Sequence, residues 1–273
     1  MNNRFEKYQY LFGPVPSRRL GYSLGIDVIP LKTCTQNCIY CELGIDQHTT
    51  IQRKAYVPVG SIMGELKKWL ELNRDADIDY FTITGSGEPT LNNQLGILID
   101  EIQKITKIPT AILTNGTLLS DPQVRKDCSK AEVVLPSLDA PNRDIFNKIN
   151  RPNPELNFES FVNGLKLFRE EYSGQIWLEL FFLEGYNTDP DSIKQFRHIL
   201  DIINPDKIQL NTYVRPGTDP DLEPVSFEKL QEIATSFGSK AEVIAGFKKS
   251  AKVVSHRNLT EKILETLKRR PCG

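Results

Sequence analysis

The chain has 273 residues, of which 39% are hydrophobic and 25% are charged, and its formal net charge at pH 7 is −1. This composition excludes a disordered chain, because it provides enough apolar residues for one large core. The near-zero net charge excludes a protein that is attracted to nucleic acid or membranes by its overall charge. The first residues show no basic segment followed by an apolar stretch, and no run is long enough for a membrane span. We therefore expect a cytoplasmic protein with no membrane partner.

Six segments have the β-branched and aromatic character of buried parallel strands, and four stretches between them place apolar residues at helical spacing. The predicted strands are 23–30, 80–84, 110–115, 132–139, 176–185 and 207–213. The helices are marked by Ile62, Leu66, Trp69 and Leu70 after a cap at Ser61; by Leu95, Leu98, Ile99, Ile102 and Ile105; by Phe161, Val162, Leu165 and Phe168; and by Ile193, Phe196, Ile199, Leu200 and Ile203 after a cap at Asp191. This alternation predicts an α/β fold, a partial (βα)6 TIM-like barrel of parallel strands with helices outside.

The pattern changes at both ends of this barrel. Residues 1–22 are interpreted as an N-terminal extension, 23–240 as the barrel, and 241–273 as a short C-terminal appendage that could begin a further module. Residues 248–270 contain eight lysines and arginines against two glutamates. Such a segment is either a contact for an anionic partner or an ordinary solvated face.

Three cysteines, Cys34, Cys38 and Cys41, follow the first predicted strand within eight residues. Thiolates at this spacing can bind three irons of one cubane cluster and leave the fourth iron open to a small molecule. The alternative is a structural zinc site completed by His48. Cys128 is interpreted as a small buried hydrophobic residue, so a second cluster is not expected.

Polar residues follow several predicted strands at their carboxyl ends, where parallel α/β folds bind ligands. They are Gly85, Ser86, Gly87 and Glu88, then Asn115 and Gly116, then Ser137 and Asp139, and lastly Asn211. Four separate segments therefore direct polar groups to one rim of the barrel.

The cysteine motif with Tyr40 before its last cysteine, followed by TGSGEP after the second strand, resembles the radical S-adenosylmethionine (radical SAM) superfamily over about residues 12–215. With FGPVPSRRLG near the start, it looks most like a branch of Fe–S oxidoreductases allied to wyosine-synthesising tRNA enzymes. The resemblance implies one 4Fe–4S cluster on the three cysteines and S-adenosylmethionine (SAM) on the open iron.

The resemblance also implies which residues contact SAM. The amino group would lie at Gly85, Ser86, Gly87 and Glu88, with Ser86 a departure from the family's usual second glycine. Ser137 and Asp139 match positions that hold the ribose or carboxylate, Asn115 is a ribose candidate, and Tyr40 would lie against the adenine. Asn115 could instead simply form a turn with Gly116, and Asp139 could cap the next helix. Glu88, before Pro89, has no evident capping role.

The family reaction uses an electron from an external donor, such as flavodoxin or ferredoxin, to cleave SAM to methionine and a 5′-deoxyadenosyl radical that abstracts hydrogen from a substrate. The first hypothesis for the substrate is a nucleoside in tRNA or other RNA. The alternatives are an activase or modifying enzyme acting on a protein, and a non-catalytic iron–sulfur or zinc protein. Residues proposed for the substrate are Arg18 and Arg19, as a clamp for carboxylate or phosphate, with Glu179 and Asn211. Solvation of the arginines and a structural ion pair for Glu179 are the competing interpretations.

Overall fold

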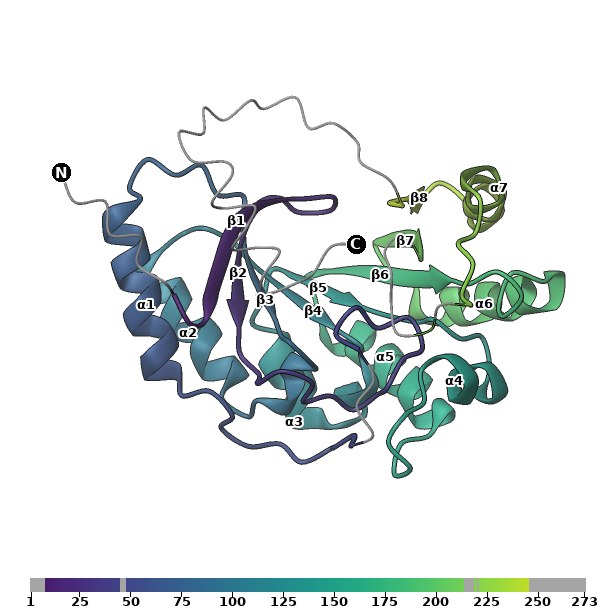
Figure 1. Cartoon of the computed structure of the whole chain (residues 1–273), viewed down its shortest axis with the longest axis horizontal. Coiled ribbons are helices and arrows are strands. Elements are labelled where there is room, and N and C mark those ends of the chain that lie inside the picture. The colour runs from purple at the N-terminus through teal and green to yellow at the C-terminus, as the bar shows by residue number, and fades with distance from the viewer. Residues whose placement is uncertain (1–7, 45–47, 214–218, 220, 246–273) are drawn as a thin grey trace.

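The computed structural model describes residues 8–44, 48–213, 219 and 221–245. Within them, eight strands form one sheet in chain order, and seven α-helices pack against it (Figure 1). The strands are β1 (Leu11–Ser17), β2 (Gly21–Asp27), β3 (Tyr80–Thr84), β4 (Thr110–Thr114), β5 (Val133–Pro136), β6 (Gln175–Phe182), β7 (Lys207–Thr212) and β8 (Ala241–Val243). The α-helices are α1 (Val59–Leu72), α2 (Leu95–Ile105), α3 (Pro122–Cys128), α4 (Arg143–Ile149), α5 (Phe158–Glu171), α6 (Pro190–Ile203) and α7 (Phe227–Phe237).

The strands pair in parallel from β2 to β8, as the alternation predicts, and β1 pairs antiparallel with β2. The α/β fold with a mainly parallel sheet is thus confirmed, with two more strands than the six predicted. One of them, β1, lies inside the segment interpreted as an N-terminal extension. The other, β8, pairs with β7 and lies at the start of the predicted appendage.

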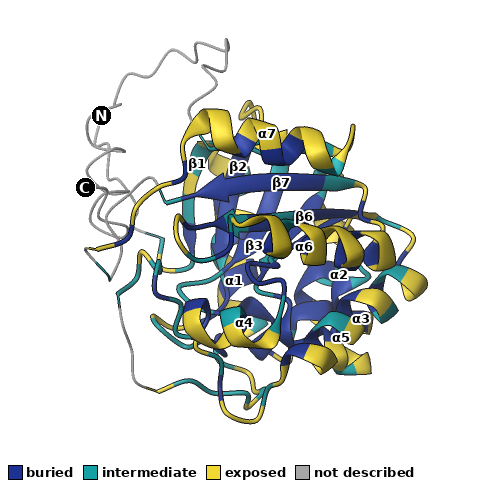
Figure 2. Cartoon of the chain, turned by 90° about the vertical axis from the view of Figure 1, so that its right-hand side faces the viewer, coloured by how far each residue is buried: buried dark blue, intermediate teal, exposed yellow. Residues whose placement is uncertain are grey.

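Strand alternation separates two cores. Leu178, Leu180 and Phe182 of β6 join the large cluster that packs between the sheet and the helices. Trp177, on the opposite face of β6, joins a small inner cluster with residues from the neighbouring strands. Figure 2 shows β6 and β7 buried, while α6 and α7 keep exposed outer faces. The inner face of the sheet therefore carries its own, smaller apolar cluster.

The turn between β1 and β2 reaches across this inner face. Leu20 is 3% exposed and belongs to the inner cluster. Arg19 Nη1 lies 2.5 Å from Glu179 Oε2 of β6, and Arg18 Nη1 donates to the carbonyl of Ile244, directly after β8, at 3.3 Å. Figure 1 shows the turn extending from β1 toward β8. Side-chain contacts from this turn thus connect the first hairpin with the last strands of the sheet.

Helix starts differ from two of the predicted caps. The N-cap of α1 is Pro58 rather than Ser61, and that of α6 is Asp189, two residues before Asp191. Asp139 caps no helix, because Asn142 occupies the cap of α4 and accepts from the amide of Ile145. Within the described residues, no helix combines the length and apolar character needed to cross a membrane.

Candidate functional site

The cysteine loop, of which residues 28–44 and 48–51 are described, leaves the carboxyl end of β2, and its residues 37–39 run along the end of α4. Ile39 N donates to the carbonyl of Ile149 at 2.9 Å, and Asn37 N donates to that of Asn150 at 3.0 Å. Cys34, Cys38 and Cys41 are each partly exposed. The loop is therefore fixed by backbone contacts on one side.

The turn after β3, Gly85–Glu88, packs directly on the start of this loop. Glu88 N donates to the carbonyl of Thr33 at 2.9 Å, and Lys32 N donates to that of Ser86 at 2.5 Å. A Cβ atom on Gly87 would lie 1.9 Å from Thr33 O. Glycine is required here because the backbone of the turn touches the backbone of the cysteine loop. This requirement does not depend on a ligand.

Ser86 is fixed by the end of β2. Its hydroxyl donates to Asp27 Oδ2 at 2.6 Å, and its amide donates to Asp27 Oδ1 at 3.1 Å. The departure from glycine at this position thus ties the turn to the strand that leads into the cysteine loop.

Glu88 is 1% exposed and supports the turn from inside. Oε1 accepts from the amide and hydroxyl of Thr90 at 3.0 and 2.6 Å and from Thr114 Oγ1 at 2.6 Å, while Oε2 accepts from Asn115 N at 2.7 Å. The expectation that it caps nothing was wrong, since it is the N-cap of the 3-10 helix Pro89–Leu91. Burial raises the pKa of Glu88, and the bonds from Thr114 and Thr90 oppose that shift.

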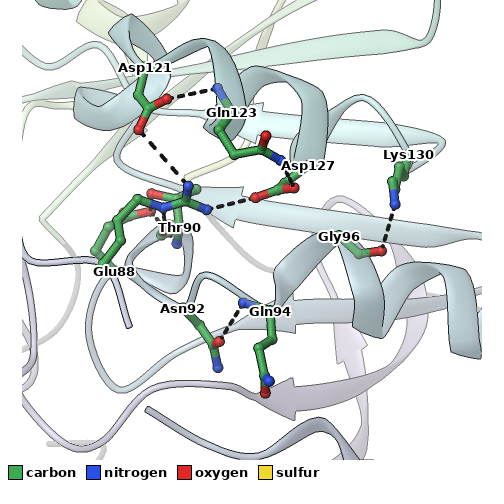
Figure 3. Close-up of polar contacts among 10 residues, drawn as sticks. Glu88, Thr90, Asn92, Gln94, Gly96, Asp121, Gln123, Asp127 and Lys130 are labelled. Atoms are coloured by element: carbon green, nitrogen blue, oxygen red, sulfur yellow. Dashed lines mark hydrogen bonds and ion pairs between the residues drawn. The ribbon is translucent and has the colours of Figure 1, made fainter. Parts of the chain in front are cut away.

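A second polar network holds the 3-10 helix that follows the turn. Arg53 donates through Nε to the carbonyl of Thr90 at 2.9 Å and through Nη2 to Asp127 Oδ2 at 2.7 Å. Gln123 Nε2 donates to Asp127 at 2.8 Å, and Figure 3 draws these contacts beside Glu88. This network fastens the 3-10 helix to α3.

Asn115, at the end of β4, points its amide at the cysteine loop. Nδ2 donates to Thr35 Oγ1 at 2.7 Å and lies 3.6 Å from Cys34 Sγ. Oδ1 accepts from the amide and the hydroxyl of Thr117 at 3.1 and 2.8 Å. Asn115 therefore forms a turn with Thr117, and its side chain is engaged by protein partners.

Tyr40 and Asp139 meet on the other side of the loop. The Tyr40 hydroxyl donates to Asp139 Oδ2, and its ring stacks on Phe181 with centroids 4.0 Å apart. Asn150 Nδ2 donates to the same carboxylate oxygen at 2.7 Å and to Cys38 Sγ at 3.5 Å. Burial raises the pKa of Asp139 to about 6, although the bonds from Tyr40 and Asn150 favour its ionised form.

Two acceptors beside this cluster have no hydrogen-bond partner among the described residues. They are Asp139 Oδ1 and Asn150 Oδ1, and both are buried. An unpartnered buried acceptor is costly unless a ligand or water supplies a donor. The sequence interpretation did not identify Asn150 as a site residue. Its neighbours in the sequence do not indicate that α4 ends beside Cys38.

A pocket of about 250 Å³ adjoins the cysteines. Glu179, on its wall, accepts from Arg19 at 2.5 Å and from Asn211 Nδ2 at 2.8 Å, so the ion-pair interpretation also holds for a residue that lines the pocket. Arg19 is committed to Glu179, and only Arg18 of the predicted clamp lines the pocket. The lining residues are Arg18, Cys38, Tyr40, Cys41, Glu42, Ser137, Glu179, Phe181, Asn211, Thr212 and Tyr213.

Burial dominates the chemistry of two of the thiols. It raises the pKa of Cys34 to about 12, with the nearby charge of Glu88 adding to the shift, and it raises that of Cys38 well above the usual value. Among the residues described, no three Cys, His, Asp or Glu side chains form a group that could hold one metal ion. A cubane cluster makes a different demand, because each thiolate binds a separate iron.

Comparison with known proteins shows the family of the chain. The sequence model of the radical SAM superfamily matches residues 28–201. A UPF0026 protein of Synechocystis sp. is 36% identical over 207 residues, which cover 76% of each chain. The GTPase Obg of Brachyspira hyodysenteriae is 41% identical over 97% of this chain, but the chain spans only 39% of that protein's length.

A likeness to solved structures concerns the fold. The structure of TYW1 with a lysine-pyruvate adduct bound has a TM-score of 0.59 at 20% identity, covering 79% of this chain and 72% of that one. Radical SAM proteins are enzymes that bind a 4Fe–4S cluster and SAM. This chain belongs to the radical SAM superfamily and, by its likeness over three quarters of a relative's length, to the UPF0026 proteins within it.

Proposed function

We propose that this enzyme holds its cluster on Cys34, Cys38 and Cys41 and abstracts hydrogen from a substrate in the adjoining pocket. When bound and reduced, the cluster supplies the electron that cleaves SAM into methionine and a carbon radical. The observation that carries the proposal is that Cys38 and Cys41 line the same pocket as Glu179 and Asn211. A radical formed at the cysteine loop would therefore be close to a substrate bound by residues of β6 and β7.

The unpartnered acceptors support a place for SAM next to Tyr40. The ribose hydroxyls and the amino group of SAM are hydrogen-bond donors, and Asp139 Oδ1 is an acceptor without a partner among the described atoms. The Tyr40 ring, held by Phe181 and by its hydroxyl, offers a preformed wall for the adenine. Ser137 lines the same pocket.

The turn Gly85–Glu88 would serve the amino group of SAM through backbone carbonyls. Both carboxylate oxygens of Glu88 already accept bonds from protein donors, so we assign Glu88 to supporting the turn. Asn115 is likewise assigned to the cysteine loop in place of the ribose, because its amide is engaged by Thr35 and Thr117.

For the substrate, the first candidate remains a nucleoside in RNA. It is supported by the resemblance to wyosine-synthesising enzymes and by Arg18, whose guanidinium at the pocket suits a phosphate. The basic segment 248–270 lies outside the described residues. Enzymes of this superfamily generally take their electron from an external donor, and we propose flavodoxin or ferredoxin for that role.

The cluster assignment is tested with anaerobically reconstituted protein. Cys38→Ala should lose SAM-dependent release of 5′-deoxyadenosine under strong reductant and the change that SAM causes in the paramagnetic resonance signal. The matched control is Cys128→Ala, because Cys128 is fully buried in the large core on α3. Equal 5′-deoxyadenosine release by both variants would refute the assignment.

The substrate is tested in cells that lack the protein, by comparing the masses of tRNA nucleosides and of peptides. An RNA substrate predicts a nucleoside that disappears and returns with the wild-type gene but not with Cys38→Ala. A change confined to a peptide would replace the RNA hypothesis with the protein-modifying alternative.

A further inference from the structure

Two asparagine side chains direct N–H groups at the sulfur atoms of the cysteine loop. Asn115 Nδ2 lies 3.6 Å from Cys34 Sγ, and Asn150 Nδ2 lies 3.5 Å from Cys38 Sγ. The two residues come from different elements, the end of β4 and the C-cap of α4. The two contacts are therefore independent features of the fold.

The orientation of the Asn115 amide follows from its partners. The backbone N–H of Thr117 can only donate, so the atom that faces it at 3.1 Å must be Oδ1. The N–H groups then face the loop, where Thr35 Oγ1 accepts at 2.7 Å. Flipping the amide would break the bond from the Thr117 N–H, because that backbone group has no proton acceptor to offer to Nδ2.

Asn150 is held by different partners. Its Nδ2 donates to Asp139 Oδ2 at 2.7 Å, the oxygen that also accepts from the Tyr40 hydroxyl, and the same nitrogen faces Cys38 Sγ. The backbone on both sides is also fixed, because Asn150 N donates to Phe146 O and Asn150 O accepts from Asn37 N. Asn150 is 1% exposed, so water does not compete for the amide.

From this geometry we propose that Asn115 and Asn150 are positioning residues that raise the reduction potential of the cluster by donating hydrogen bonds to the sulfurs of Cys34 and Cys38. The inference rests on the cluster assignment above. One-electron reduction adds negative charge that spreads onto the ligating sulfurs, and burial in a low-dielectric site disfavours that charge. An N–H dipole aimed at sulfur stabilises the reduced form more than the oxidised form.

The test is a redox titration of the anaerobically reconstituted protein followed by paramagnetic resonance. Asn150→Leu removes one donor without adding charge. Asn115→Asp keeps the oxygen that accepts from Thr117 and loses the donor to Cys34. Asn150→Leu should reduce the ratio of reduced to oxidised cluster at a fixed potential by about threefold, which is about 30 mV toward negative values at 59 mV per tenfold. Asn115→Asp should shift the potential further in the same direction, because it also adds a negative charge.

The matched control is Asn153→Leu. Asn153 is 9% exposed and supports the same loop through Thr49 O and Oγ1, both at 3.1 Å. Its side chain contacts Thr49 rather than a cysteine, so its loss should leave the potential unchanged. Iron and sulfide content, measured on every variant, separates a cluster that fails to assemble from one whose potential has shifted.

A second readout does not depend on the potential. In D2O, pulsed resonance of the reduced cluster should detect exchangeable deuterons near the ligating sulfurs, and their signal should weaken in Asn150→Leu and Asn115→Asp. Full cluster content with unchanged potentials and deuteron couplings would overturn the inference alone. A cluster that assembles equally well in Cys38→Ala would instead refute the underlying assignment.

Discussion

At Gly87, the turn after β3 and the cysteine loop are in backbone contact. The obstacle to any side chain there is Thr33 O, a main-chain atom that cannot rotate away. We expect Gly87→Ala to displace the loop, to lower the iron bound per chain on reconstitution, and to reduce the free energy of unfolding by about 1–3 kcal/mol. Iron analysis and urea denaturation measure the two effects.

Gly64→Ala is the control for that substitution. Gly64 lies within α1, and nothing lies within 4 Å of the added Cβ. Alanine in a helix should stabilise the protein by about 0.5–1 kcal/mol and leave iron binding unchanged. A Gly87→Ala protein with full iron content and unchanged stability would show that the loop adapts freely.

The role of a single residue could be predicted from the sequence only where that role depends on its neighbours in the chain. The cysteine spacing and the glycine-rich turn are continuous patterns, so they could be recognised. The roles of Asn150, Asp27 and Thr114 arise from distant partners, and no local pattern reports them. Glu88 was recognised as important, but its role inside the protein depends on Thr114, 26 residues away.

Among the elements, α6 allows a direct test of a cap. Asp189 accepts from the amides of Asp191 and Ser192 and from the Ser192 hydroxyl. Asp189→Ala should lower the free energy of unfolding at pH 7 by about 1 kcal/mol. The sequence pattern predicted the cap at Asp191. Asp191→Ala should lower the free energy of unfolding by clearly less, because Asp191 lies in the first turn and only complements the helix dipole. Equal losses in the two variants would contradict the cap assignment.

The same cap predicts a dependence on pH. The hydroxyl of Ser192, followed by its amide, holds the pKa of Asp189 below its usual value. Because the folded pKa is the lower one, the stabilisation is complete above the usual pKa, near 4, and is lost as pH falls through the folded value. The difference in stability between wild type and Asp189→Ala should therefore shrink below about pH 4. Urea titrations at several pH values measure it, and a difference that grows toward acid pH would contradict the pKa shift.

Prediction of elements succeeded for most of the long helices, but it missed α7, which has 11 residues. The four predicted helices correspond to α1, α2, α5 and α6, each of at least 11 residues. Helices α3 and α4 have seven residues each, too few for a periodic signal. Strand β1 contains Pro14 and Pro16, which argue against a strand in general but are tolerated at the edge of a sheet.

At the scale of the whole molecule, Arg19 and Glu179 join the first hairpin to β6. Both side chains are about 15% exposed, so the pair is partly shielded from water. A double-mutant cycle of Arg19→Ala and Glu179→Ala should give a coupling free energy of about 1–2 kcal/mol. The control pair is Arg143 and Glu159, a 2.8 Å ion pair at an exposed position, whose coupling should be much smaller. Equal couplings for the two pairs would exclude a special role for the hairpin contact.

That contact spans 160 positions of the chain. A nascent polypeptide that has reached Asn153 already contains the hydrogen-bond partners of the cysteine loop named above, from Asp27 through Asn115 to Asn150. Phe181, which stacks on Tyr40, and the pocket wall formed by Glu179 and Asn211 are not yet synthesised at that point. Long-range closure of this kind is entropically slow, and synthesis proceeds from the N-terminus. We therefore expect the cysteine loop and its hydrogen-bond partners to fold before the pocket wall, and ribosome-stalled chains of increasing length would reveal this order.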